Sequence, residues 1–396
     1  MLFIAVIFSL ITAISEVDII VPSLPEIQSL YRLNPFMVEL VLGLNLLAHC
    51  IAALFAANIG DRFGRKKTII SGFILFVAGG FIGALVDNFY IILAGRVIQG
   101  VGVAPAIVLS YIIAMERYPV SEQGRIMGIL NGTVALTLSI APVLGSFISL
   151  HYGYQGNFWL MVTTGILAIA TIYIGIPSDK AGDSGIKLGL SQYTPVLKSL
   201  NTMIYVVFVS ILIATYYTFV GLASLFFIQG LGMGLRDFGF YMAALTLTFG
   251  IYSIFSGKII KLLGKFNAFL MSIVFIAMFI ISSTWVIMYD IASPLFILAC
   301  LLLFVVGMVV PVNEGYVMAL ESFPDGKARA SALIGTLKWI FTVAGVQTAS
   351  IFFNGNFKAI GVTLTVMLSL SISLIFMAYA KDSRFRNLLN SRSSNK

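Results

Sequence analysis

Residues 58–67 read Asn-Ile-Gly-Asp-Arg-Phe-Gly-Arg-Lys-Lys and separate two long apolar runs, residues 36–57 and 68–86. The glycines permit a tight turn and a close approach of helices, and Asp61 and Arg65 can pair with charges at neighbouring helix ends. A basic loop that only orients a membrane protein needs Lys and Arg, and not this pattern of Gly and Asp. The stretch therefore indicates a specific joint between two apolar helices.

The composition of the chain favours a lipid environment. Hydrophobic residues make up 59% of the 396 residues and charged residues only 10%, against roughly 25% charged in an ordinary soluble domain. So few charges cannot cover a globular surface of this size, whereas a bilayer lets apolar side chains face outward. We therefore expect several membrane spans.

The apolar runs predict an all-α integral membrane protein with twelve transmembrane helices. A helix needs roughly 20 residues to cross the hydrocarbon layer. Met1 to Ile14 has no basic segment of a signal peptide and continues to the acids Glu16 and Asp18, so we interpret it as the first span. The predicted spans lie near residues 2–22, 36–57, 68–86, 90–115, 125–148, 157–176, 202–229, 237–257, 266–288, 293–318, 328–350 and 358–379.

The basic residues predict the orientation of these spans. Of the 24 Lys and Arg residues, 19 fall in the tail or in loops on one face and three on the other, Arg32, Arg236 and Lys358. Because cytoplasmic loops carry the excess of Lys and Arg, both termini are expected in the cytoplasm. The same signal accounts for the net charge of +8 without a nucleic-acid partner.

One long polar stretch divides the chain into two halves of six helices. We expect an N-terminal bundle at 1–176, a cytoplasmic linker at 177–201, a C-terminal bundle at 202–380 and a cytoplasmic tail at 381–396. Two weak internal matches support a repeat: residues 63–65 (Phe-Gly-Arg) with 263–265 (Leu-Gly-Lys), and 115–119 with 320–324. Six-helix repeats of this kind are typical of secondary transporters.

Several motifs resemble the major facilitator superfamily. Residues 58–67 resemble its signature loop, Arg96 to Gly102 its fourth-helix motif, and the run Gly132 to Gly145 with Pro142 its antiporter motif in helix 5. Asp18-Ile-Ile-Val-Pro-Ser-Leu-Pro25 resembles the bicyclomycin-resistance-like drug/proton antiporters. The chain departs from these patterns at Ile20, where an aromatic residue is usual, and at Ala141 and Ser146, where Gly is usual.

The resemblance implies alternating access, with two six-helix halves rocking about a cavity lined by helices 1, 4, 7 and 10. Asp18 is then the leading proton acceptor, Glu16 and Glu314 are the alternatives, and Arg96 is the counter-charge of the acid. The resemblance further implies a conformational latch and a kink in helix 5. The latch residues are Gly60, Asp61, Gly64, Arg65 and Glu116, and the kink residues are Gly132, Pro142 and Gly145.

Other polar residues within the spans need a role. Lys338 lies too deep to reach water easily, so it pairs with an acid or lines the substrate pathway. Tyr216 and Tyr217 suit an aromatic substrate cavity, although interfacial roles are as common, and Asn131 is either a cavity residue or a packing group. Glu16 and Asp18 lie about 200° apart around a regular helix, so only one of them is expected to face a given neighbour.

The chain has no HExxH and no GxSxG motif, and its two cysteines lie in apolar runs, so we expect neither an enzyme, a cofactor nor a metal. The expected partners are a small organic substrate, protons and lipid, with a monomer in a bacterial inner membrane. The leading hypothesis is a proton-coupled antiporter that exports an amphipathic compound or drug. A proton-coupled importer of a metabolite or siderophore is the alternative, and a non-transporting enzyme or receptor is disfavoured.

Overall fold

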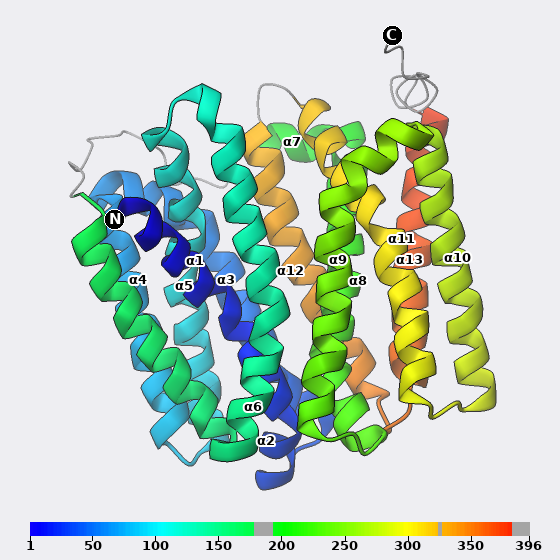
Figure 1. Cartoon of the computed structure of the whole chain (residues 1–396), viewed down its shortest axis with the longest axis horizontal. Coiled ribbons are helices and arrows are strands. Elements are labelled where there is room, and N and C mark those ends of the chain that lie inside the picture. The colour runs from blue at the N-terminus through cyan, green and yellow to red at the C-terminus, as the bar shows by residue number, and fades with distance from the viewer. Residues whose placement is uncertain (178–192, 324–326, 382–396) are drawn as a thin grey trace. The chain divides into compact units, whose positions relative to one another are not determined.

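The computed structural model describes residues 1–177, 193–323 and 327–381, which form helices joined by short connections, with no strand among them (Figure 1). At most of these connections the chain reverses its direction after one span (Figure 1). The helices are α1 (Leu2–Ile20), the 3₁₀ turn η1 (Val21–Ser23), α2 (Leu24–Leu30), α3 (Pro35–Phe63), α4 (Arg65–Leu85), α5 (Phe89–Arg117), α6 (Val120–Gly175), α7 (Thr194–Lys198), α8 (Leu200–Ser224), the π-helical segment η3 (Leu225–Gly230), α9 (Leu235–Leu263), α10 (Lys265–Tyr289), α11 (Pro294–Glu321), α12 (Lys327–Ile351) and α13 (Lys358–Lys381).

Eleven helical segments of the described residues are long and apolar enough to cross a membrane. One of them, Arg125–Gly175, belongs to α6, which breaks at Gly153 where φ is 67° and ψ is −172°. The two arms of α6 run in opposite directions (Figure 1) and correspond to the predicted spans 125–148 and 157–176. The prediction of an all-α protein with twelve crossing segments is therefore confirmed.

Local sequence signals explain where the helices begin and end. The Asn34 side chain accepts a hydrogen bond from the Met37 backbone N–H at 2.8 Å and caps α3, and Asn88 caps α5 in the same way. Gly64 (φ 92°) separates α3 from α4, and Gly264 (φ 80°) separates α9 from α10. These backbone angles favour glycine, so the two joints of the proposed repeat have the same local structure.

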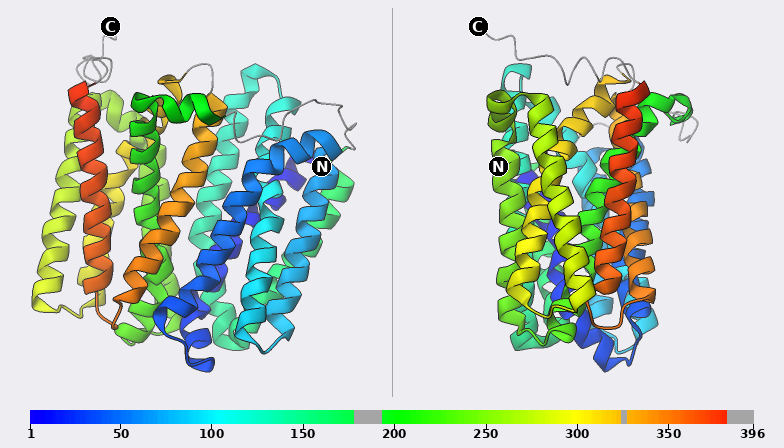
Figure 2. Two further views of the ribbon diagram at one scale, coloured as in Figure 1. Left: turned by 180° about the vertical axis from the view of Figure 1, so that it is seen from behind. Right: turned by 90° about the vertical axis from the view of Figure 1, so that its right-hand side faces the viewer.

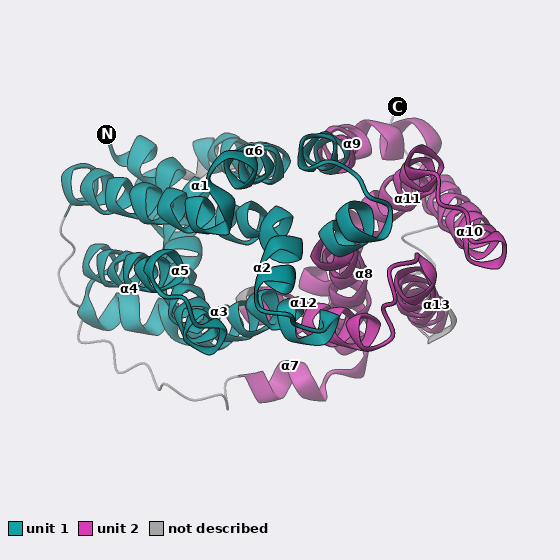
Figure 3. Cartoon of the chain, turned by 90° about the horizontal axis from the view of Figure 1, so that it is seen from below, with its two compact units in different colours: residues 1–188, 223–243 teal, residues 189–222, 244–396 magenta. Residues whose placement is uncertain are grey.

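The chain divides into two compact units, drawn in different colours in Figure 3. Unit 1 comprises Met1–Leu188 and Ala223–Ala243, and unit 2 comprises Gly189–Leu222 and Ala244–Lys396. The boundaries predicted for the two bundles stay a prediction.

Small residues bring the helix backbones of unit 1 into contact. A Cβ atom placed on Gly100 of α5 would lie 2.2 Å from the Asn45 carbonyl oxygen of α3. One placed on Gly72 of α4 would lie 2.4 Å from the Gly102 carbonyl oxygen of α5. Such contacts take the place of a hydrophobic driving force between helices in lipid, and they hold α3, α4 and α5 in a fixed register.

In unit 2, α10 packs along α11, and α13 lies beside α10 and α12 (Figure 2). A Cβ atom on Gly307 of α11 would lie 2.8 Å from the Ile276 side chain of α10. The aromatic rings of Phe279 and Phe304 pack in the same interface, with their centroids 5.3 Å apart.

Candidate functional site

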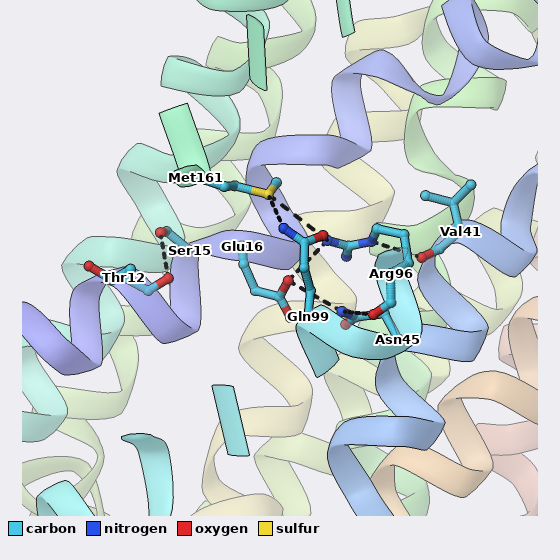
Figure 4. Close-up of polar contacts among 8 residues, drawn as sticks. All are labelled: Thr12, Ser15, Glu16, Val41, Asn45, Arg96, Gln99 and Met161. Atoms are coloured by element: carbon cyan, nitrogen blue, oxygen red, sulfur yellow. Dashed lines mark hydrogen bonds and ion pairs between the residues drawn. The ribbon is translucent and has the colours of Figure 1, made fainter. Parts of the chain in front are cut away.

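Arg96, on α5, is the largest fully buried side chain of the described residues and lies inside a span. Its Nη1 atom is 3.0 Å from Glu16 Oε2 on α1 and donates a hydrogen bond of 2.9 Å to Gln99 Oε1 (Figure 4). Its Nε atom donates to the Val41 carbonyl oxygen of α3 at 3.1 Å. A buried arginine in lipid is costly unless it is paired, and here one carboxylate supplies the opposite charge.

Two amides complete this polar cluster. Asn45 Nδ2 donates to Glu16 Oε2 at 3.3 Å and to the Arg96 carbonyl oxygen at 3.0 Å (Figure 4). Gln99 Nε2 lies 3.5 Å from Met161 Sδ on α6. Glu16, Asn45, Arg96 and Gln99 have no exposed surface, so the cluster joins α1, α3, α5 and α6 away from solvent.

The expected pairing of Asp18 with Arg96 is wrong in this structure, because Glu16 occupies that position. Two residues along a helix rotate a side chain by about 200°, so Asp18 cannot face α5 when Glu16 does. The Asp18 side chain is 3% exposed, and no ion pair joins it to another described residue. The two acids of α1 therefore have different surroundings.

The residues of the predicted latch lie together at the Gly64 joint. Arg65 donates to Asp61 Oδ1 at 3.1 Å, and two of its nitrogens contact the Glu116 carboxylate of α5, with an Nη2 to Oε1 distance of 2.7 Å. A Cβ atom on Gly60 would lie 2.7 Å from Leu109, so this glycine allows α3 to approach α5. The geometry brings together all five predicted residues, Gly60, Asp61, Gly64, Arg65 and Glu116.

Unit 2 contains a similar ion pair at its own glycine joint. Lys265, which follows Gly264, lies 2.9 Å from Glu314 Oε2 on α11. The internal sequence match aligned Glu116 with Glu321, but the acid that pairs with Lys265 is Glu314. Because Glu314 is held by a lysine near a helix end, we do not retain it as a candidate for proton transfer.

The predicted kink residues of the fifth span, which lie on the first arm of α6, differ in how closely neighbouring helices approach them. A Cβ atom on Gly145 would lie 2.3 Å from the Ile19 carbonyl oxygen of α1, whereas one on Gly132 would meet nothing within 4 Å. Pro142 lies inside α6, three residues before Gly145. Asn157, on the other arm of α6, donates to the Gly145 carbonyl oxygen at 3.2 Å. The motif thus ends in a close contact with α1.

The four residues predicted to line a substrate cavity fall into two places. Asn131, in unit 1, is exposed and accepts a hydrogen bond from the Tyr111 hydroxyl at 3.4 Å. Tyr216, Tyr217 and Lys338 belong to unit 2, where Tyr216 is buried and the other two are half-buried. The centroids of the Tyr216 and Tyr217 rings are 5.5 Å apart.

Glu39 of α3 is a buried acid that the sequence analysis did not single out. It has no exposed surface, and neither carboxylate oxygen has a hydrogen-bond partner among the described residues. The signal was present, because Glu39 is the one acid inside the apolar run 36–57. It was hard to weigh, since an acid five residues into a span is close enough to a helix end to reach water.

The described residues form many helices that can cross a membrane, and they bury an ion pair inside these spans. These features are typical of a polytopic membrane protein. The Major Facilitator Superfamily model matches residues 2–346, and the chain belongs to that family. It is therefore a multi-pass integral membrane transporter and not an enzyme, as the sequence predicted.

Two comparisons add detail. The multidrug resistance protein MdtL of Escherichia coli SMS-3-5 is 29% identical over 153 residues, 39% of each chain. MdtL of Shigella flexneri is 24% identical over 251 residues, 63% of each chain. The matched part of the chain thus spans between about two-fifths and just under two-thirds of these relatives.

Solved structures share the fold at low identity. A bacterial homologue of the human lysosomal transporter Spinster, in an inward-facing and occupied conformation, has a TM-score of 0.75 at 13% identity and covers 97% of each chain. A D-xylose-proton symporter has a TM-score of 0.67 at 15% identity, with 94% of this chain and 96% of that chain covered. Both comparisons confirm the major facilitator fold.

Proposed function

We propose that this transporter exports small amphipathic organic compounds in exchange for protons by alternating access. The supporting observation is the unequal surroundings of the two acids of α1. Glu16 is committed to Arg96, whereas Asp18 is buried without an ion pair among the described residues. A buried carboxylate that lacks a fixed counter-charge changes its protonation more readily than one in a salt bridge. We therefore assign proton transfer to Asp18 and a positioning role to the pair of Glu16 and Arg96.

The names of the relatives support the export of drugs. Two of the matching proteins are multidrug resistance proteins, and the helix 5 and helix 1 motifs resemble those of drug/proton antiporters. We propose that the contacts of Arg65 with Asp61 and Glu116 act as the latch that steadies one state of the transport cycle. The expected location is a bacterial inner membrane, with both termini in the cytoplasm.

Transport into proteoliposomes tests the coupling and its direction. An antiporter accumulates ethidium or 2-naphthalenesulfonate when the vesicle interior is acidic, because protons leave as substrate enters. A symporter accumulates them when the external medium is acidic. Accumulation driven only by external acid, or no flux driven by either gradient, would refute antiport.

The assignment of Asp18 is tested by Asp18→Asn in the same vesicles. We expect this variant to lose accumulation driven by the pH gradient while it keeps substrate binding in detergent. Glu39→Gln is the comparison, since it neutralises another buried acid of unit 1 that has no ion pair among the described residues, and it should keep the coupling. If Asp18→Asn couples proton movement to substrate as the parent does, the proton is carried elsewhere.

The orientation is tested by cysteine labelling. A cysteine at Ser184, in the linker and outside the described residues, is expected to resist an impermeant maleimide added to intact cells. A cysteine in place of Arg32 is expected to react. The opposite pattern would reverse the proposed topology.

A further inference from the structure

Lys338 lies near the middle of a membrane-crossing helix. It follows the start of α12 at Lys327 by 11 residues and precedes its end at Ile351 by 13, so it lies about 16 Å from one end and about 20 Å from the other at 1.5 Å per residue. Both distances exceed the length of an extended lysine side chain. Lys338 therefore cannot reach water along the lipid face, and a charge exposed to hydrocarbon at this depth is very unfavourable.

Lys338 has no carboxylate partner in the part of the chain that the structure describes. The ion pairs there join Arg65, Arg96 and Lys265 to acids, and Lys338 is in none of them. Its ammonium lies instead 4.6 Å from the centroid of the Trp339 ring. Taken as a whole residue, Lys338 is half-buried.

Aromatic rings of unit 2 extend from this ammonium. The Trp339 centroid is 4.8 Å from that of Tyr217, whose ring lies 5.5 Å from that of Tyr216. Tyr216 stacks against Phe249 at 5.8 Å. Trp339, Tyr217 and Phe249 are each half-buried. We call Lys338, Trp339, Tyr217, Tyr216 and Phe249 the lysine–aromatic cluster.

We infer that the lysine–aromatic cluster binds the substrate, and that the substrate is an aromatic organic anion. The rings offer apolar surfaces for stacking, and Lys338 supplies up to three N–H donors and a positive charge to an acidic group on the same molecule. The inference deepens the proposed export function and rests on it, because it names the chemical class of the exported compound.

The charge at the lysine–aromatic cluster itself favours an anion over a cation. In unit 1 the charge of Arg96 is matched by Glu16, and the carboxylates of Asp18 and Glu39 are buried. Among the described residues of unit 2, Lys338 has no carboxylate partner, and its ammonium faces the Trp339 ring. A cationic substrate at the cluster would meet a like charge at low dielectric, whereas an anion would supply the missing counter-charge.

Binding of two naphthalene compounds with fixed and opposite charges tests the inference. The purified full chain in detergent is dialysed to equilibrium against 2-naphthalenesulfonate or (2-naphthyl)trimethylammonium, which share one ring system and do not titrate. We expect the sulfonate to bind at least about tenfold more tightly than the ammonium compound, because one charge-assisted hydrogen bond contributes about that factor to the affinity.

Variants then locate the effect. Lys338→Gln should weaken sulfonate binding by about tenfold or more and leave ammonium binding unchanged or tighter, while Lys338→Arg should retain sulfonate binding within about threefold. The matched control is Lys358→Gln, which removes a lysine of the same unit at the start of α13 and should change neither affinity. The arginine variant also separates a loss of charge from a loss of folding.

Three results would overturn the inference: equal or tighter binding of the ammonium compound, unchanged sulfonate binding in Lys338→Gln, or no binding of either compound. These results leave the proton-coupled export hypothesis standing if a pH gradient still drives ethidium into proteoliposomes. Conversely, sulfonate binding that depends on Lys338 without any flux driven by a pH gradient would support the site and refute the coupling.

Discussion

The ion pair between Glu16 and Arg96 makes a strong prediction about stability. Glu16→Gln keeps the shape of the side chain but removes the counter-charge of an arginine with no exposed surface. Arg96 would keep its bonds to the Val41 carbonyl and to Gln99, and these neutral groups do not balance a full charge. Removing one partner of a buried pair costs about 3–5 kcal/mol. We therefore expect Glu16→Gln to lower the melting temperature by about 6–20 °C, at about 2–4 °C per kcal/mol for a unit of roughly 200 residues.

The chain contains its own reporters for this measurement. Cys50 and Cys300 are both buried, so a thiol-reactive coumarin maleimide reacts with them only on unfolding. Cys50 lies in unit 1 and Cys300 in unit 2. With Cys300→Ala as background, the dye follows the unit that holds Arg96. With Cys50→Ser as background, it follows the other unit.

A double-mutant cycle separates the pair from its surroundings. Arg96→Met in the Glu16→Gln background removes the unpaired charge, so the double variant should recover much of the loss that Glu16→Gln causes alone. The reasoning would be refuted if Glu16→Gln melted within about 2 °C of the parent. It would also be refuted if the two substitutions lowered the melting temperature additively.

Three further predictions follow from the close contacts and charges. Gly145→Ala should lower stability by about 1–3 kcal/mol, because its Cβ would lie 2.3 Å from the Ile19 carbonyl oxygen, while Gly132→Ala, with nothing within 4 Å, should be neutral in the same dye assay. Asp61→Asn should lower transport turnover at matched expression and leave substrate affinity within about threefold, so an unchanged turnover would argue against the latch. Glu39→Gln should not lower the melting temperature, because neither carboxylate oxygen has a partner among the described residues to lose, and a clear drop would mean that the acid has one.

The sequence predicted the helices better than the contacts between them. Apolar runs long enough to span a bilayer are visible in one dimension, and so are caps such as Asn34 and joints such as Gly64. The partner of a buried charge depends on which face of each helix meets its neighbour. The sequence analysis therefore paired Arg96 with Asp18, whereas the structure pairs it with Glu16, although the angular separation of the two acids showed that only one of them could face Arg96.

The latch was predictable for a different reason. Asp61 and Arg65 lie four residues apart across the glycine joint, so local geometry alone brings them together. The Glu116 contact came from the family resemblance and joins residues 51 apart in sequence. The resemblance offered no partner for Lys265. The match by sequence spacing aligned Glu321 with Glu116, whereas Lys265 pairs with Glu314. A helix end offers several acids within two turns, and spacing alone does not choose among them.

The break at Gly153 has a practical consequence for engineering this transporter. Two spans meet there at a single residue, and a Cβ atom on Gly153 would lie 2.8 Å from Glu26 Oε1. An epitope tag or a fluorescent fusion inserted here would push apart two helical arms that no loop residues separate. The connection at 352–357 between α12 and α13 contains Gly355 and exposed side chains, and it is the better site for such a tag.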